Sequence, residues 1–389
     1  MKDCFEYCTG CGLCHSVYDV PFEKDAKGFW VPMSTTDSFS RQVMSEICPF
    51  GKMGVSDYSG SVWGKYILAV RAFASDEDIR YKASSGGVIT SVAAYLLKQK
   101  MVDGVILTKA DPSVPYHCVT ICAKSEKEIV DACGSRYSQS APLMNILQLI
   151  EPSKKYAVIG KPCDIAVLRR YMNSNSALQS QIQYLLSFFC AGMPSDRANQ
   201  KLLEELECSN CVQLRYRGYG WPGYTTAIDN DGTVHRMEYK KSWMDILGRD
   251  IRKCCKFCFD GIGEAADISC GDLWNLKSDK KPDFSESKGY NIVFARTQIG
   301  IKLLKQAIED GVVQSENWES KLEELRYCQP NHYIKRTTIL GKILALKILN
   351  KPAPKYSFVR MLAYAKKTDM KTQIGSFKGT IKRSIHNKL

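Results

Sequence analysis

The sequence lacks several features that would place it in a familiar class of proteins. Its longest apolar run, Tyr184 to Gly192, is about half of the roughly 18 residues that a membrane-spanning helix needs. The first residues, MKDCFEYCTGC, contain no apolar core of a secretory signal peptide. With 27 Gly and 14 Pro in 389 residues, the chain is neither collagen-like nor of low complexity. We therefore expect a soluble intracellular protein of the cytoplasm.

Common motifs of nucleotide-binding and hydrolytic enzymes are absent as well. The sequence contains neither a G-x-G-x-x-G fingerprint nor a Walker A loop, so a standard dinucleotide fold or a P-loop has no support. None of the five histidines belongs to an H-E-x-x-H zinc motif or to a deaminase motif. Acidic residues are scarce only between Lys335 and Leu389, where 14 Lys and Arg face a single acid, Asp369. The formal charge of +13 therefore belongs to a C-terminal tail, and the body of the chain is neutral.

Cysteine, by contrast, is abundant, with 17 residues. In a reducing compartment, clustered cysteines indicate metal or redox sites rather than disulfides. Cys8, Cys11 and Cys14 form a C-x-x-C-x-x-C run, and Cys48 precedes a proline. This is the ligand pattern of a ferredoxin-type 4Fe-4S cluster. A zinc knuckle is the alternative interpretation, although zinc usually takes two separated C-x-x-C pairs.

A second set of cysteines is dispersed along the chain. Cys163 lies in the turn after one expected strand, and Cys190 ends another. If the two strands are parallel, their carboxyl ends meet at one edge of the sheet, where α/β folds bind ligands. Cys255 and Cys258 add a C-x-x-C pair in a later loop, so the four thiolates could hold a second 4Fe-4S cluster. Spacing alone leaves ordinary buried thiols equally open.

The other cysteines are less informative. Cys254 and Cys270 compete as ligands of the second set. The rest are expected to pack in the core, although the Cys208-x-x-Cys211 spacing leaves a metal site open there. These packing residues are Cys118, Cys122, Cys133, Cys208, Cys211 and Cys328.

Short apolar runs alternate with helical patterns, which predicts an α/β protein of mixed sheet layers with a largely parallel sheet. The expected strands are 65–72, 102–107, 156–160 and 182–190, and an expected helix follows Ser84-Ser85-Gly86-Gly87. We expect four parts: a small ferredoxin-like iron–sulfur module at 1–58, domains at 59–150 and 151–330, and a basic helical tail at 331–389.

The start of the helix after Ser84-Ser85-Gly86-Gly87 is a candidate anion site. Free amides, serine hydroxyls and the positive end of the helix dipole meet there, and the pyrophosphate of a flavin or nucleotide would fit. The alternative is a serine N-cap followed by a loop glycine.

The tail is predicted to contain two helices. Ile339 to Leu349 is apolar on all sides and is expected to be buried. The second helix has an apolar face with basic residues opposite, which suits an anionic membrane surface or an acidic partner. No nucleic-acid-binding motif accompanies the charge, and a solvated tail is the simplest interpretation. The apolar face comprises Phe358, Met361, Leu362 and Ala365, with Arg360 and Lys367 opposite.

Together these features resemble the beta-subunit family of coenzyme F(420) hydrogenases and dehydrogenases, and the chain is similar to plant 7-hydroxymethyl chlorophyll a reductase. Seven matching stretches follow one another in family order over roughly residues 1–300. They are CTGCGLC (8–14), SSGGVITSV (84–92), GSRYSQS (134–140), IGKPCDIAVLR (159–169), SFFCAG (187–192), RGYGWPG (217–223) and CKFCFDGIGEAADISCGDLW (255–274).

The resemblance implies a bound FAD and, beside it, a 4Fe-4S cluster held by Cys163, Cys190, Cys255 and Cys258. It also implies that the flavin is held by Ser85, Gly86, Gly87, Thr90, Ser135, Arg136 and Tyr137. The N-terminal cluster then serves as an electron port for a ferredoxin or a redox partner subunit. The sequence departs from the family at Lys161 and Asp164, and the tail beyond about Pro330 has no counterpart there.

The resulting hypothesis is an iron–sulfur flavoprotein oxidoreductase with two 4Fe-4S clusters and one FAD. It passes electrons from a ferredoxin-like donor through the clusters to FAD and an organic substrate, which the sequence does not name. One alternative is a true deazaflavin (coenzyme F(420)) oxidoreductase subunit. Another is a flavin-free binding or scaffold protein of a polysaccharide-assembly system, recruited by its tail to the inner face of the membrane.

Overall fold

The computed structural model describes residues 6–33, 48 and 60–386. In that part of the chain, no helix has the length and apolar character required to cross a bilayer. Half of the predicted module at 1–58 lies outside the described residues. What is described of it is a short helix and a two-stranded antiparallel hairpin. These elements are α2 (Leu13–Tyr18), β1 (Phe22–Lys24) and β2 (Trp30–Pro32).

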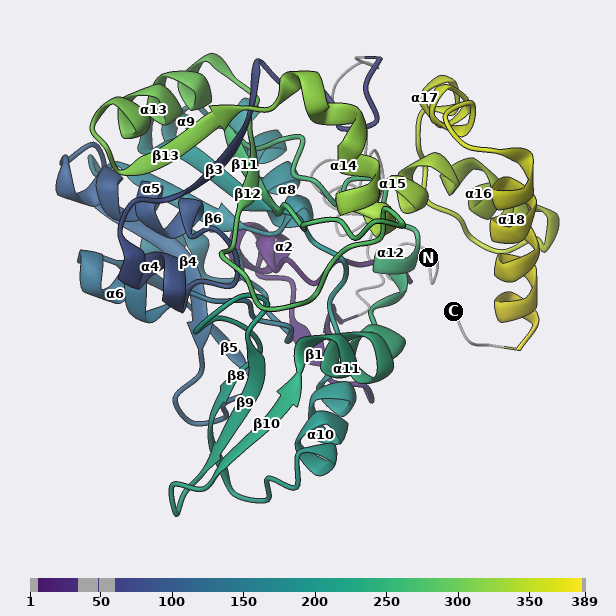
Figure 1. The fold of residues 1–389 in the computed structure, drawn as a ribbon, viewed down its shortest axis with the longest axis horizontal. Coiled ribbons are helices and arrows are strands. Elements are labelled where there is room, and N and C mark those ends of the chain that lie inside the picture. Colours follow the sequence, from purple (N-terminus) through teal and green to yellow (C-terminus); the bar gives the residue numbers. More distant parts are fainter. Residues whose placement is uncertain (1–5, 34–47, 49–59, 387–389) are drawn as a thin grey trace.

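An eight-stranded sheet forms the centre of the molecule (Figure 1). Its order is β13 (Val313–Asn317), β3 (Leu68–Ala74), β12 (Asn291–Ala295), β11 (Ile268–Asp272), β7 (Ile182–Phe188), β6 (Tyr156–Gly160), β4 (Gly104–Ala110) and β5 (Cys118–Ala123). Only the four neighbouring strands β11, β7, β6 and β4 are mutually parallel. The other pairs are antiparallel. The prediction of mixed layers is confirmed, whereas the expectation of a largely parallel sheet is wrong.

Helices cover both faces of this sheet because its central strands are apolar on both sides. Ala157 of β6 packs with Val92 of α5 and Leu303 of α13 on one face. Tyr156 and Val158, which point the other way, pack against α8 and α9. The helices around the sheet are α4 (Glu77–Lys82), α5 (Val88–Lys98), α6 (Glu126–Asp131), α7 (Ile146–Leu149), α8 (Pro162–Asn173), α9 (Ser176–Gln181) and α13 (Gln298–Glu309).

A three-stranded antiparallel sheet lies below the main sheet in Figure 1. Residues 218–223 form the turn between its first two strands. Its core is apolar and includes Leu214, Ala227 and Met237. The elements are α10 (Asp196–Glu205), β8 (Cys211–Arg215), β9 (Tyr224–Asp229), β10 (Val234–Glu238), α11 (Tyr239–Lys241), η2 (Ser242–Ile246) and η3 (Leu247–Arg249).

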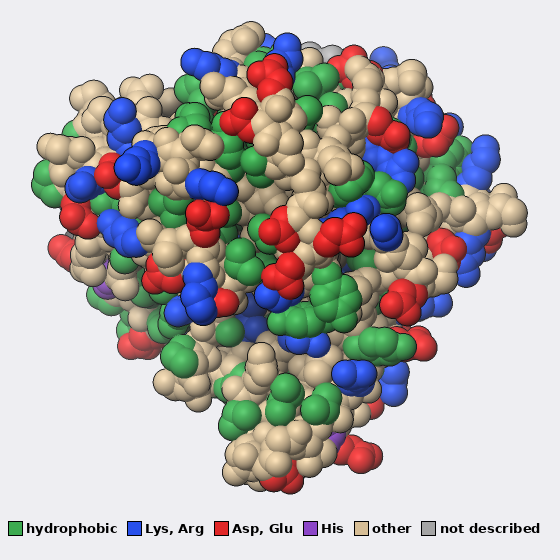
Figure 2. Space-filling model, turned by 60° about the vertical axis from the view of Figure 1, so that its left-hand side comes forward, with side chains coloured by type: hydrophobic (Ala, Val, Ile, Leu, Met, Phe, Trp, Pro, Cys, Tyr) green, Lys and Arg blue, Asp and Glu red, His purple; other side chains and the backbone are tan. Residues whose placement is uncertain are grey.

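Figure 2 shows a face on which acidic and basic side chains are interspersed and hydrophobic ones gather near a central hollow.

The C-terminal helices pack against the body, so the expectation of a solvated tail is wrong. Ile343 and Met361 share a hydrophobic cluster with Tyr7, Phe257 and Phe259. These helices lie at one side of the molecule (Figure 1). The remaining elements are α12 (Lys253–Lys256), η4 (Glu319–Glu324), α14 (Leu325–Cys328), α15 (Pro330–Thr337), α16 (Ile339–Ile348), α17 (Phe358–Ala365) and α18 (Met370–Ile385).

The predicted apolar face of α17 is wrong for a physical reason. Arg360, expected on the solvent side, is 4% exposed and forms an ion pair with the buried carboxylate of Glu264, which also pairs with Arg336 at 2.5 Å. This network turns Arg360 inward, and the apolar side chain of Phe358 is left 59% exposed. The prediction that the helix 339–348 is buried is confirmed in part: one side packs inward, whereas Leu344 and Ile348 are 42% and 68% exposed.

Candidate functional site

A cavity of about 790 Å³ lies at the carboxyl ends of the parallel strands β6, β7 and β11. This is the edge at which open α/β sheets bind their ligands, and the volume is in the range of small-molecule sites. Gly160 ends β6 at the cavity and Lys161 follows it, Phe188 ends β7 there, and Asp272 ends β11. The small sheet closes the opposite side with Arg217.

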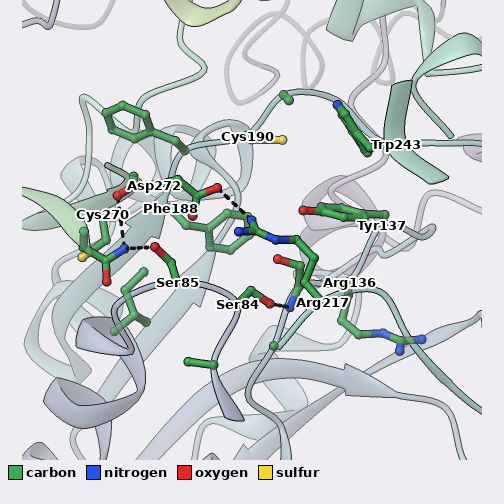
Figure 3. A pocket seen from close by; sticks show the side chains of 18 of the residues that line it. Ser84, Ser85, Arg136, Tyr137, Phe188, Cys190, Arg217, Trp243, Cys270 and Asp272 are labelled. Carbon is green, nitrogen blue, oxygen red and sulfur yellow. Dashed lines mark hydrogen bonds and ion pairs between the residues drawn. The ribbon is translucent and has the colours of Figure 1, made fainter. Parts of the chain in front are cut away.

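The start of α5, the candidate anion site of the sequence, forms one wall of this cavity. Ser84 Oγ accepts a hydrogen bond from the Ser135 amide at 2.5 Å, which joins the two predicted binding segments (Figure 3). The Asn291 amide group donates to Ser85 Oγ at 3.0 Å and accepts from the Val88 amide at 3.3 Å. The predicted residues that line the cavity are Ser85, Gly87, Thr90, Ser135, Arg136 and Tyr137. Gly86 adjoins the cavity. A Cβ at Gly86 would lie 2.8 Å from the backbone nitrogen of Asn291.

Two arginines next to the cavity play different parts. The guanidinium of Arg136, which the resemblance singles out, donates to the backbone carbonyls of Leu214 and Pro115 at 2.8 and 2.5 Å. In Figure 3 it points away from the centre of the cavity. Arg217 instead points inward and donates to Asp272 at 2.8 Å. Arg136 therefore braces the wall, and Arg217 presents its charge to the cavity.

Arg217 is the main cavity residue that the sequence reasoning missed. Its side chain is 3% exposed, and its Nη2 has no hydrogen-bond partner among the described residues. Burial alone would lower the pKa of Arg217, but Asp272 and two neighbouring tyrosines raise it, so the group is charged. Its only signal in the sequence is its place at the start of RGYGWPG.

A second, smaller cavity of about 40 Å³ gathers the dispersed cysteines. Cys163, Cys190, Cys255 and Cys258 all line it, although they come from three separate segments of the chain. Cys254 lines it too and remains a competing ligand, whereas Cys270 lines the large cavity instead. The geometry therefore supports the predicted grouping and removes one of the two competitors.

The two cavities share a wall. Lys161 and residues 190–193 line both. Gly192 of this wall has a φ of +146°, and a Cβ there would lie 3.0 Å from Ile251. A side chain at this position would therefore strain the backbone of the wall, which favours glycine.

The thiols of the small cavity differ in acidity. Burial raises the pKa of Cys190 to about 11 and that of Cys163 well above its usual value. A hydrogen bond from Cys254 lowers the pKa of Cys255 to about 6 despite its burial, and the charge of Lys335 lowers it further. A thiolate is the form that binds metals, and Cys255 is the one of these thiols that loses its proton most easily.

Lys161 and Asp164, the two departures from the family pattern, form an ion pair of 2.7 Å beside Cys163. Both are buried, with side chains 11% and 0% exposed. Burial alone would lower the pKa of Lys161, but Asp164 raises it. Burial raises the pKa of Asp164, although Lys161 opposes this effect. The two charges thus compensate each other next to the cysteines.

The N-terminal cysteines also lie close together. Burial raises the pKa of Cys14, and the neighbouring Cys11, Cys8 and Cys48 thiols raise it further. The Gly10 amide donates to Cys8 Sγ at 3.3 Å, the kind of N–H···S contact that surrounds iron–sulfur clusters. The loop approaches its neighbours closely at Gly12, which has a φ of +86° and would place a Cβ 2.7 Å from Met144.

Comparisons with known proteins agree with this architecture. The family model "Coenzyme F420 hydrogenase/dehydrogenase, beta subunit N-term" matches residues 69–148. The companion model, for the C-terminal part of the same beta subunit, matches residues 153–321. Together they cover more than half of the chain.

Relatives of known activity have about a quarter of their residues in common with this chain. The coenzyme F420 hydrogenase subunit beta of Methanococcus voltae is 24% identical over 75% of this chain and 99% of its own. The F420-dependent formate dehydrogenase subunit beta of Methanocaldococcus jannaschii is 25% identical over 67% of this chain and 64% of its own. The chloroplastic 7-hydroxymethyl chlorophyll a reductase of Oryza sativa is 24% identical over 80% of this chain and 62% of its own.

A solved structure has the same fold. A chain of the F420-reducing [NiFe] hydrogenase complex from Methanosarcina barkeri matches with a TM-score of 0.56 and 22% identity, over 77% of this chain and 98% of that one. These relatives are named as oxidoreductases or as subunits of them. The chain belongs to the coenzyme F420 hydrogenase/dehydrogenase beta-subunit family, a family of oxidoreductases.

Proposed function

We propose that this protein is an iron–sulfur flavoprotein oxidoreductase that passes electrons from a ferredoxin-like donor to an organic substrate in the cytoplasm. The observation that carries the proposal is the shared wall between the cysteine-lined cavity and the larger cavity. A cluster held in one and a flavin held in the other would be immediate neighbours. When bound, these groups supply one-electron exchange and two-electron reduction, respectively.

The large cavity suits an anionic, aromatic cofactor such as FAD. Its volume of about 790 Å³ falls within the usual range for such ligands. The amino end of the 11-residue helix α5 favours negative charge. Nη2 of the buried Arg217 has no partner in the part of the chain that the structure describes. The rings of Tyr137 and Trp243, with centroids 4.7 Å apart, form an aromatic side. Ser85, Thr90 and Ser135 would complete the polar contacts.

The small cavity suits a 4Fe-4S cluster because its donor set is made of thiols. Four thiolates are the ordinary ligands of such a cluster, and the lowered pKa of Cys255, to about 6, favours one of them. The N-terminal cluster, the port for a ferredoxin or a redox partner subunit, would be held by Cys8, Cys11, Cys14 and Cys48. Thr9, between Cys8 and Cys11, lines the small cavity, so the two cysteine sets adjoin.

The deazaflavin alternative is favoured by the names of the hydrogenase and formate dehydrogenase relatives. In that case coenzyme F(420) would be the substrate of the flavin in the large cavity. Titration with reduced coenzyme F(420) tests it. Tight binding with bleaching of the flavin would support this alternative, and the absence of both would leave another organic substrate.

The proposal as a whole is tested by anaerobic purification with iron, sulfide and flavin measured per chain. We expect about eight iron, about eight sulfide and about one FAD, since each cluster has four of each inorganic atom. About four iron with FAD would leave one cysteine set as packing residues. A preparation without iron and flavin would overturn the proposal in favour of a binding or scaffold protein.

Single substitutions then assign the ligands of the small cavity. Cys163→Ser should lower the iron content by about half and retain FAD. Cys122→Ser is the matched control, because this thiol lines neither cavity. Cys254→Ser distinguishes the competing ligand. If Cys254→Ser lost iron and Cys163→Ser did not, the proposed ligand set would be incorrect.

A further inference from the structure

A separate group of potential metal ligands lies in the small three-stranded sheet, away from both cavities. Cys208 precedes β8, and Cys211 begins it. Asp229 ends β9, where it is paired with Cys211 across the antiparallel ladder. His235 belongs to β10 and is paired with Ala227. Residues two apart on a strand share a face, so Asp229 and His235 project to the same side of the sheet.

The side chains of this group are already in contact. Cys208 Sγ lies 3.0 Å from Asp229 Oδ1, and His235 Nε2 lies 3.0 Å from Asp229 Oδ2. The ligand atoms of these three residues are all within 4.8 Å of one another. Among the residues that the structure describes, no other group of three His, Cys, Asp or Glu meets this distance.

Cys211, paired with Asp229 across the ladder, is the candidate for a fourth donor. Its thiol donates to the Gln213 carbonyl at 3.3 Å, so it would turn from that carbonyl to join the other three side chains. The group is also shielded from water: Cys208 is 5% exposed, and the side chains of His235 and Asp229 are 17% and 14% exposed.

We propose that Cys208, Cys211, Asp229 and His235 bind one zinc ion. Two thiolates, an imidazole and a carboxylate make four donors of the types that Zn²⁺ takes in closed, tetrahedral structural sites. Calcium and magnesium prefer oxygen donors alone, so sulfur and nitrogen ligands exclude them. The two cysteines have the C-x-x-C spacing of zinc sites.

The surroundings of the carboxylate fit this role. The Asn210 amide donates to Asp229 Oδ1 at 2.8 Å, the kind of outer contact that fixes a ligand in position. Zinc would replace the protons that now join Cys208 and His235 to Asp229, because thiols and imidazole bind metals only when deprotonated.

A zinc ion here would brace the side of the large cavity. The ligands sit where β8 begins, β9 ends and β10 begins, all at one end of the small sheet. At the other end, Arg217 follows β8 and Tyr239 follows β10, and both line the large cavity. The metal would thus hold the strands that position Arg217, without touching the cavity itself.

The experiment measures zinc and iron together in the full-length protein, purified without air from cells supplied with zinc. We expect about one zinc per chain in addition to the iron, bound by two sulfur and two nitrogen or oxygen atoms in zinc-edge X-ray absorption. Cys208→Ser and His235→Ala should lose the zinc and keep the iron. Cys122→Ser and His386→Ala, at positions outside this group, should keep both metals.

Several results would overturn the proposal. Wild-type protein without zinc would do so, as would zinc that survives both ligand substitutions. Four sulfur neighbours in the absorption spectrum would assign the zinc to another cysteine set. A disulfide between Cys208 and Cys211, detected by mass spectrometry of the anaerobic protein, would also exclude the metal. Because the wild-type measurements need no variant, poor folding of a substituted chain does not leave the question open.

Discussion

The conservative substitution Arg217→Lys separates a cofactor contact from a merely structural charge. Lysine keeps the positive charge beside Asp272 but loses the planar fork of donors. In the wild type, Nη1 is used by Asp272 at 2.8 Å, while Nη2 is buried without a partner among the described residues. We expect Nη2 to donate to an anionic oxygen of the flavin. A lysine ammonium has three donors on one nitrogen, so it lacks the two separately placed nitrogens with which the guanidinium reaches Asp272 and the flavin.

The magnitude follows from the number of bonds lost. One hydrogen bond to a charged group contributes about 1.5–3 kcal/mol. At about 1.4 kcal/mol for each tenfold change, Arg217→Lys should weaken FAD binding about 10- to 150-fold. The measurement is a titration of flavin-depleted protein with FAD, followed by quenching of flavin fluorescence. Iron content in the same samples shows whether the fold and the clusters are retained.

Arg136→Lys is the matched control. The Arg136 guanidinium binds backbone carbonyls of neighbouring loops, so its replacement should lower the melting temperature and leave FAD affinity nearly unchanged. Equal FAD affinity of Arg217→Lys and wild type, with loss of affinity in Arg136→Lys, would refute the reasoning from the structure. It would restore Arg136 as the flavin ligand that the family resemblance implies.

Three further outcomes are expected. Glu264→Gln should lower the free energy of unfolding, measured in urea, by about 3–5 kcal/mol because it breaks a buried ion network. Glu316→Gln, at an exposed pair, should lower it by about 1 kcal/mol or less. Equal losses of stability in the two variants would contradict this expectation. Burial opposes ionisation of Glu264, but its two arginines lower its pKa from 4.5 to about 2. Its stabilisation is therefore complete above pH 4.5 and is lost as the pH falls toward 2, a dependence that Glu264→Gln should flatten. Cys11→Ser should abolish reduction by ferredoxin and leave FAD bound, and surviving ferredoxin-driven turnover would disprove the electron port. Replacing the exposed Phe358 and Val359 by serine should weaken binding to anionic vesicles at unchanged flavin content, and unaltered binding would end the membrane hypothesis.

The sequence predicted those parts of the molecule whose cause is local. The strand 156–160 was expected at the bounds that β6 has, because a short apolar run ends there at a glycine and a proline. The helix after Ser84-Ser85-Gly86-Gly87 was expected from apolar spacing and begins at Val88. The meeting of Cys163 and Cys190 followed from the rule that parallel strands present their carboxyl ends at one edge.

What the sequence could not give depends on contacts between distant segments. Arg136 and Arg217 look alike as sequence, and it is the backbone carbonyls of Leu214, Pro115 and His117 that hold Arg136 away from the cavity. In the same way, the inward orientation of Arg360 depends on a carboxylate almost one hundred residues earlier in the chain. A helical pattern cannot reveal such a partner, because a buried charge violates the rule on which the pattern rests.

The C-terminal tail acquires a role that its composition conceals. The family models end at residue 321, yet Pro354 and Tyr356 line the small cysteine cavity. The Tyr356 hydroxyl donates to the Phe257 carbonyl, between two of the cysteines, at 2.7 Å. Lys335 donates to the Ala191 carbonyl at 2.5 Å and helps to lower the pKa of Cys255. Although its charge suggests a solvated or membrane-bound segment, the tail closes the cavity in which we place a cluster. Its basic residues therefore belong in part to the electrostatics of the redox site, where exclusion of water makes each charge count for more.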